Sequence, residues 1–218
     1  MQRKNLWFGF VLAAVMTLTL SVRGYSAESQ VRKDFVTALE QNDSIKAASI
    51  VDANKDKVPL EIKAILDEAA VPGVTREEMD GKFYLAELMA KHYKDSTGDM
   101  EPLKEVKKKI FDSKLTPPIR STAVAGVHTV DCPEPAGDIK NIFRPDNILI
   151  KKGETVRWVN NDKEGHIFAS MPFIGMSGIF STKVEQGQSW DFKFEKAGEY
   201  FYMCFIHQGM LGKVTVEE

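Results

Sequence analysis

The sequence has few cysteines and no marked excess of either charge. Only 2 of its 218 residues are cysteine, which excludes the disulfide-rich scaffolds of small secreted proteins. The 29 basic and 31 acidic residues leave a net charge of -2, so electrostatics gives no reason to expect nucleic acid or an anionic membrane surface as a partner. The 4 histidines limit how many metal centres the chain could build. Hydrophobic residues nevertheless make up 43% of the chain, enough for one large or two small packed domains.

Long apolar runs are also scarce, and the one that stands out lies at the N-terminus. Two basic residues precede an apolar stretch from Leu6 to Leu20, and polar residues follow it. The stretch is short for a spanning helix, which needs about 20 apolar residues, and its layout is typical of a secretory signal. We therefore expect residues 1–27 to be a signal peptide that ends at Ala27, and the protein to be periplasmic or otherwise extracytoplasmic. Because Tyr25 fits the cleavage motif poorly, an uncleaved anchor that tethers the protein to a membrane is the alternative.

Residues 28–115 show the periodicity of helices. Hydrophobic residues recur three or four positions apart, as Val31 and Phe35 do. Thr75 with Glu78 is typical of a capping box at the start of a helix. The pattern predicts four or five short helices packed as a small all-α bundle. No histidines, cysteines or carboxylates stand at ligand spacing in this part, so its role is left open among docking, spacing and oligomerisation.

The periodicity changes after two adjacent prolines, Pro117 and Pro118, which stiffen the chain and suit a domain boundary. We expect residues 116–137 to form a linker and a lead-in strand. Residues 138–218 then carry short runs of β-forming residues, separated by turns that contain glycine or asparagine. Such a series predicts an all-β sandwich. The predicted strands are Ile148–Ile150, Val156–Val159, Trp190–Phe194, Tyr200–Tyr202 and Val214–Val216.

A thiol, an imidazole and a thioether lie close together near the C-terminus. They belong to Cys204, His207 and Met210. Such donors are too soft for Mg²⁺ or Ca²⁺, which prefer oxygen. Two histidines and one cysteine in a trigonal arrangement, with a distant methionine, are the ligands of a blue-copper site. A second histidine must come from elsewhere in the chain, and His166, which follows a predicted strand, is the leading candidate.

The C-terminal part, from Asp138 onward, resembles the cupredoxin family of blue-copper proteins, and within it the amicyanin and plastocyanin branch. The segment Lys152–Asn160 is similar to the strand that leads to the family's first histidine ligand, with His166 six residues beyond it. The segment Ala197–Tyr202 is similar to the strand that leads into the cysteine loop. The spacing of the last two expected ligands is like that of amicyanin. The resemblance implies a Greek-key β-sandwich that holds one type-1 copper ion per chain.

The resemblance also implies the role of each residue at the site. His166, Cys204 and His207 would form the strong trigonal ligand set, and Met210 would be a weak axial ligand. Asn160 would brace the loops that carry His166 and Cys204, because residues around the ligands orient them. A redox partner protein would dock near His207, since the family presents the edge of this ring within an exposed apolar surface. The candidates for that surface are Met171, Pro172, Phe173, Ile174, Met176, Ile179, Phe180 and Leu211.

Two positions depart from the family's pattern. Ile167 stands where the family usually has a small polar residue after the first histidine, and Phe205 stands where it has threonine or serine after the cysteine. We therefore expect the side-chain hydrogen bonds that normally tie these two loops together to be missing. The resemblance still implies copper binding, but it does not predict the reduction potential.

Several other donors have more than one interpretation. Cys132 and His128 could form a second metal pair, but a free thiol is favoured because two donors on a loop are thin evidence. A disulfide between Cys132 and Cys204 would destroy the copper site, which leaves Cys132 unpaired or bonded to another chain. Met171 and Met176 could be extra soft ligands, although methionine more often fills gaps in a core.

The function that follows is an exported, non-enzymatic blue-copper protein that carries single electrons. A copper oxidase or nitrite reductase would need a histidine directly beside the cysteine ligand, where Met203 and Phe205 stand. A binuclear copper centre would need two cysteines in the loop, and only Cys204 is there. A copper-binding module for storage, delivery or sensing, without an electron partner, is the alternative.

Overall fold

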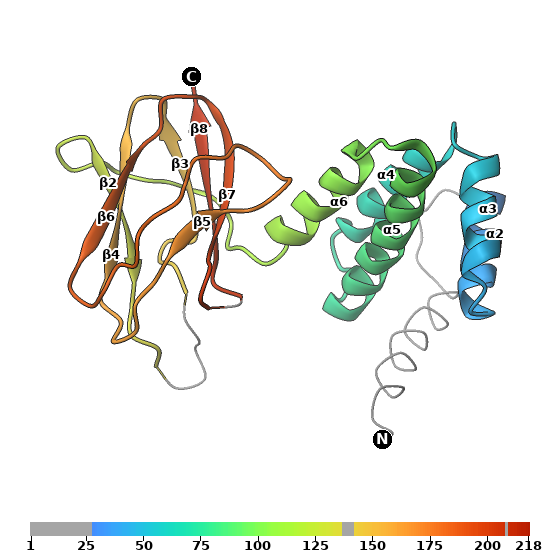
Figure 1. Cartoon of the computed structure of the whole chain (residues 1–218), viewed down its shortest axis with the longest axis horizontal. Coiled ribbons are helices and arrows are strands. Elements are labelled where there is room, and N and C mark those ends of the chain that lie inside the picture. Colours follow the sequence, from blue (N-terminus) through green and yellow to red (C-terminus); the bar gives the residue numbers. More distant parts are fainter. Residues whose placement is uncertain (1–27, 137–141, 208) are drawn as a thin grey trace. The chain divides into compact units, whose positions relative to one another are not determined.

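The computed structural model describes residues 28–136, 142–207 and 209–218. The chain divides into two compact units, Met1–Ile110 and Phe111–Glu218, of which the first is helical and the second is built of strands (Figure 1). The predicted order of an all-α bundle followed by an all-β domain is therefore confirmed. The predicted signal peptide, residues 1–27, lies outside the described residues. None of the helices in the described part of the chain is long and apolar enough to span a membrane.

The helices begin where the sequence provides caps. The side chain of Ser29 accepts a hydrogen bond from the backbone of Arg32, and Thr75 and Glu78 form the predicted capping box. Gly98 ends the longest helix in the left-handed conformation, with φ 78°, which glycine adopts without a steric penalty. The helices are α2 (Gln30–Glu40), α3 (Ser44–Ala53), α4 (Val58–Ala69), α5 (Arg76–Thr97) and α6 (Glu101–Asp112).

A partly buried ion-pair network connects helices of the helical unit. Arg32 on α2 is buried and donates to Glu68 on α4 at 2.7 Å. Lys82 on α5 donates to the other carboxylate oxygen of Glu68 at 2.9 Å. Glu68 thus connects three helices. The unit also has its own apolar core, which includes Phe35, Val51, Ile62, Ile65, Phe83, Met89 and Val106.

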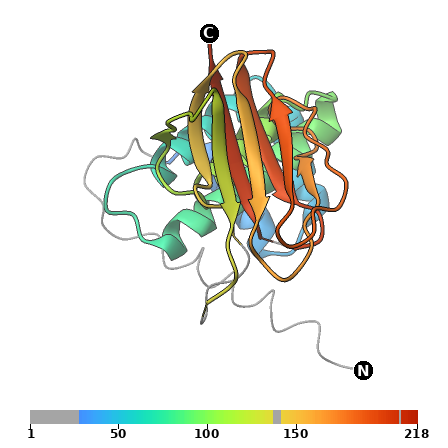
Figure 2. The ribbon, with the colours of Figure 1, turned by 90° about the vertical axis from the view of Figure 1, so that its left-hand side faces the viewer.

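The strands of the second unit form two sheets, which overlap in the view of Figure 2. The five-stranded sheet has the order β1-β3-β8-β7-β5, and the three-stranded sheet has the order β2-β4-β6. Both sheets mix parallel and antiparallel pairs. The strands are β1 (Ile119–Arg120), β2 (Val127–Cys132), β3 (Asn147–Lys151), β4 (Thr155–Asn160), β5 (Phe168–Ser170), β6 (Ser189–Lys193), β7 (Gly198–Cys204) and β8 (Leu211–Glu217).

Alternation along β4 shows how the sequence builds the core. Val156, Trp158 and Asn160 are buried, whereas Arg157 between them is exposed, as expected for a strand with one face inward. The two tryptophans of paired strands, Trp158 and Trp190, have ring centroids 5.4 Å apart. Asn160 ends β4 with its side chain turned into the interior, and the loop that follows carries His166.

Three strands lie outside the runs predicted as strands. β1 and β2 fall within residues 116–137, where a linker and a lead-in strand are expected, and β5 follows His166. β2 pairs in parallel with β4, so His128 and Cys132 belong to a strand and not to a loop as expected. Both side chains are buried.

A small second apolar cluster covers the outer side of β7 and β8. Phe111, at the end of α6, packs edge-on against Phe201 with ring centroids 5.2 Å apart. Asp112 accepts a hydrogen bond from Lys213 at 2.9 Å, and Glu199 lies 2.7 Å from the same ammonium group. The residues that close α6 are therefore part of the strand unit.

Candidate metal centre

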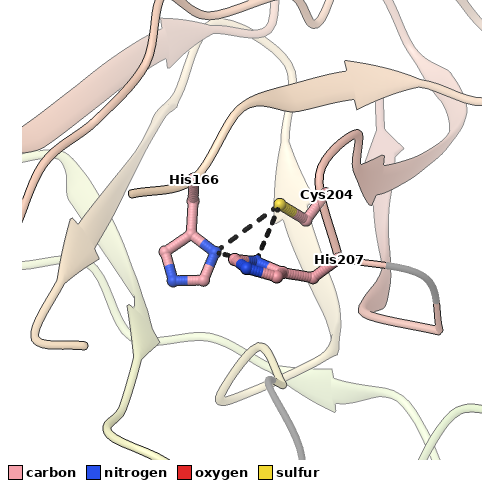
Figure 3. Close-up of side chains that lie close together, drawn as sticks. All are labelled: His166, Cys204 and His207. Carbon is pink, nitrogen blue, oxygen red and sulfur yellow. Dashed lines mark hydrogen bonds between the residues drawn. The ribbon is translucent and has the colours of Figure 1, made fainter. Parts of the chain in front are cut away.

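Three side chains predicted as ligands lie close together in the strand unit (Figure 3). The Nδ1 atoms of His166 and His207 are 3.0 Å apart, and each lies 3.5 Å from the sulfur of Cys204. His166 and Cys204 are buried, and His207 is partly exposed. The structure thus brings together residues 38 positions apart in the sequence, His166 and Cys204, as the copper hypothesis requires.

Backbone pairing holds the two loops against each other. Cys204 is the last residue of β7 and pairs with Phe168 at the start of β5. The next backbone N–H, that of Phe205, donates to the carbonyl of Ile167 at 2.7 Å. A main-chain hydrogen bond therefore connects the two loops at Ile167 and Phe205, the positions where the family's side-chain hydrogen bonds were expected to be missing.

The loop that carries His166 is fixed from both sides. His166 exchanges two backbone hydrogen bonds with Val184, at 3.0 and 2.8 Å. The amide of Asn160 donates to the carbonyls of Glu164 and Val184, and its oxygen accepts the N–H of Asp162. Asn160 thus braces the His166 loop as predicted, whereas the expected brace to the Cys204 loop has no counterpart among these bonds.

Met210 is buried beside the cluster. Its backbone carbonyl accepts the N–H of Cys204 at 3.0 Å, and its own N–H donates to the carbonyl of His207 at 3.3 Å. These bonds fold the chain from Cys204 to Met210 into a tight loop. The side chain of Met210 belongs to the main apolar core, so this edge of the site is closed to water.

The spacing of the donor atoms fits a metal ion. A first-row metal such as zinc bonds to nitrogen at about 2.0 Å and to sulfur at about 2.3 Å, so one ion can join donors up to about 4 Å apart. The separations of 3.0 and 3.5 Å lie within that reach. Two imidazoles and one thiolate are the strong ligands of a blue-copper site, because soft sulfur together with imidazole suits copper.

Two carboxylates contact the outer nitrogens of the histidines. Nε2 of His207 donates to Glu164 at 2.6 Å, and Nε2 of His166 lies 3.2 Å from a carboxylate oxygen of the buried Asp162. Burial lowers the pKa of His166, and nearby His207 acts in the same direction, so the ring is neutral and able to bind a metal. The sequence interpretation missed both acids, although they stand two and four positions before His166.

The expected apolar surface is only partly exposed. Ile174 and Ile179 are buried, which corrects the expectation that they line it, because their side chains pack into the two apolar clusters. Phe173 and Phe180 are exposed. Two further exposed residues, Phe205 and Ile206, directly follow the cysteine and were missed. They could have been found from their place in the ligand loop.

The remaining donors lie outside the cluster. Cys132 is a free thiol in the main core, and burial raises its pKa, so it stays protonated. His128 is paired with Glu154 at 2.9 Å. Met176 packs against the main core and Met171 against the cluster of Phe111. These placements agree with packing roles.

Comparison with known proteins adds an independent observation. Residues 131–217 match the family described as copper binding proteins, plastocyanin/azurin family. The plastocyanin of Scenedesmus fuscus is 36% identical over 85 residues, which are 35% of this chain and 87% of that protein. The amicyanin of Paracoccus versutus is 33% identical over 103 residues, which are 45% of this chain and 78% of that protein.

A solved structure is similar to part of the chain. The purple cupredoxin from Nitrosopumilus maritimus is 27% identical, has a TM-score of 0.37, and covers 41% of this chain and 98% of that protein. The plastocyanin and the amicyanin each match over most of their own length, and copper is the metal that the matched family binds. The chain therefore belongs to the plastocyanin/azurin family of copper-binding proteins.

Proposed function

We propose that this protein is an exported carrier of single electrons, in which His166, Cys204, His207 and Met210 hold one type-1 copper ion. The observation that supports this most strongly is the triangle of two imidazole nitrogens and one sulfur, 3.0 to 3.5 Å apart. It lies within the part of the chain that matches a copper-binding family.

The surroundings of the site suit electron transfer. When bound, a copper ion supplies the one-electron change between Cu(II) and Cu(I). The protein holds Cys204 and His166 on backbone hydrogen bonds that leave little room for rearrangement, and the core around Met210 excludes water. His207 is the partly exposed member of the triangle, so an electron would leave or enter through its ring.

A redox partner protein would dock over His207. The ring lies in the same short loop as Phe205 and Ile206, which are exposed, and an exposed apolar surface commonly marks a docking site. An extracytoplasmic location, as the N-terminal sequence predicts, is part of the proposal.

Electron transfer is favoured over enzymatic catalysis by the positions of the other histidines. His92 packs edge-on against Phe35 in the helical unit, and His128 is paired with Glu154. Each already has a structural partner, and neither belongs to the cluster at Cys204. A second, catalytic copper would have to find its ligands elsewhere.

Loading with copper tests the proposal. The protein with Cu(II) should be intensely blue, lose its colour with a mild reductant such as ascorbate and regain it on oxidation. Copper should also raise the thermal midpoint, because a ligand bound only by the folded state stabilises it.

Cys204→Ala should abolish the blue absorption, since the thiolate produces it. Cys132→Ala is the matched control, because this second thiol is buried in the core but lies outside the cluster, and its variant should stay blue. A wild-type protein that binds only Cu(I) and stays colourless would instead indicate copper delivery or sensing.

A further inference from the structure

Both histidines of the cluster face a carboxylate of one short loop. The loop runs from Asn160 to His166 and contains Asp162 and Glu164. Glu164 accepts the Nε2–H of His207 at 2.6 Å, and Asp162 lies 3.2 Å from Nε2 of His166. In each ring the other nitrogen, Nδ1, points to the sulfur of Cys204. One loop therefore contacts the outer nitrogens of both rings.

The two contacts differ in their surroundings. Asp162 is buried, and one of its carboxylate oxygens lies 3.2 Å from Nε2 of His166, which is also buried. Glu164 is 66% exposed at its side chain, whereas the His207 side chain that it contacts is 18% exposed. Glu164 therefore contacts His207 from the solvent-exposed side. Solvent screens the charge of Glu164 more strongly than that of the buried Asp162.

The loop is fixed by hydrogen bonds among its own residues. The second carboxylate oxygen of Asp162, Oδ1, lies 3.3 Å from the backbone N–H of Glu164, which donates to it. The amide of Asn160 donates to the carbonyl of Glu164 at 2.7 Å. These bonds fix the backbone of the stretch from which both carboxylates extend.

We propose that Asp162 and Glu164 are positioning residues that keep both imidazoles with Nδ1 free for copper and that favour Cu(II) over Cu(I). This inference rests on the proposed function, because it assigns Nδ1 of both rings to the metal. A carboxylate that accepts Nε2–H fixes the tautomer in which Nδ1 carries the lone pair. Its negative charge also increases the electron density of the ring and stabilises the more highly charged ion.

The consequence is a lower reduction potential than the four ligands would give without the acids. Partners in the shell around metal ligands commonly change metal affinity by about 10-fold to 100-fold. If removal of one acid lowers the preference for Cu(II) over Cu(I) by about tenfold, the potential rises by about 59 mV for this one-electron couple. The effect should be smaller at the exposed Glu164 than at the buried Asp162.

Substitution of Glu164 gives the most direct test, because this exposed residue can change without harm to the fold. In the copper protein, Glu164→Ala should raise the reduction potential and Glu164→Gln should raise it less, since the amide oxygen still accepts the Nε2–H bond. Glu185→Gln is the matched control: it removes an equal charge from a neighbouring exposed residue that is paired with Lys183. Its potential should stay at the wild-type value.

Asp162→Asn tests the buried acid. The variant keeps an oxygen for the N–H of Glu164 but presents an NH₂ group to the Nε2–H of His166, so we expect the larger rise in potential. If Asp162→Asn fails to fold, the Glu164 variants still test the proposal. Equal potentials in wild type, Glu164→Ala and Glu185→Gln would overturn the role of Glu164.

A measurement on the metal-free protein separates this inference from the proposed function. The ¹⁵N chemical shifts of His207 report which ring nitrogen carries the proton. The wild type should show the Nε2–H form, and Glu164→Ala should show a mixture with Nδ1–H. A wild-type protein that never turns blue would contradict the copper proposal, whereas an unchanged tautomer in Glu164→Ala would contradict the positioning role alone.

Discussion

Met210 is the proposed ligand whose chemistry can be changed with least disturbance of the other three. Its side chain lies in the core, and its backbone is bonded to Cys204 and His207. We expect Met210→Gln to stay blue but to have a lower reduction potential, because an amide oxygen is a harder donor than a thioether and favours Cu(II). Each tenfold change in the ratio of affinities corresponds to about 59 mV, which voltammetry resolves easily.

The same substitution at Met176 provides the control. Met176 packs against the main core without belonging to the ligand loop. Met176→Gln should cost stability and leave the potential unchanged. A shifted potential in Met176→Gln would revive the interpretation of this residue as an extra soft ligand.

The end of α6 is an element that stabilises the strand unit from outside the sandwich. Phe111 is buried against Phe201, and Asp112 accepts a hydrogen bond from Lys213. We expect Phe111→Ala to lower the free energy of unfolding of the strand unit by about 3–5 kcal/mol, as is usual when a buried aromatic ring is removed. Loss of the blue absorption in a urea titration of the copper protein would measure it.

Phe180→Ala is the control for this element. Phe180 is 74% exposed, so its removal should change the unfolding free energy by no more than about 0.5 kcal/mol. If Phe111→Ala were as stable as Phe180→Ala, the strand unit would not depend on the end of α6.

In the described part of the chain each of the two units has its own main apolar core, and each core should respond to its own perturbation. In the helical unit, burial alone would raise the pKa of Glu68, but hydrogen bonds from Lys82 and Arg32 outweigh it, and the pKa is lowered. A lowered carboxyl pKa contributes stability above the usual glutamate pKa of about 4.3, and that stability is lost as the pH falls through the folded-state value. We therefore expect the helical unit to weaken below about pH 4.

Glu68→Gln should be less stable than wild type at pH 7, by roughly 1–3 kcal/mol, because the buried Arg32 loses a charged partner. The difference should shrink in acid, where the wild type loses the same charge. Helical circular dichroism against temperature at several pH values would measure the difference in stability.

Asp67→Asn, in an exposed pair with Lys63, should change the free energy of unfolding little. A blue absorption that disappeared together with the helical signal would show that the two cores do not unfold independently.

Much of this arrangement could be predicted from periodicity and local chemistry. The capping box of Thr75 and Glu78 and the strand at Val156–Val159 depend on neighbours in the sequence, and both are found as expected. β2 and β5 were harder to predict from the sequence. β2 lies in the region where a linker and a lead-in strand were expected, and β5 has only three residues.

The sequence by itself determined the donors: their number, their softness and the spacing of Cys204, His207 and Met210 depend on residue type and on position along the chain. Only the tertiary structure decided which groups surround these donors. The approach of His166 to Cys204, the main-chain bond from Phe205 to Ile167, and the contact of Glu164 with His207 arise where β4 and β7 end and β5 begins. Contacts between segments distant in sequence follow from packing, and no local pattern in the chain encodes them.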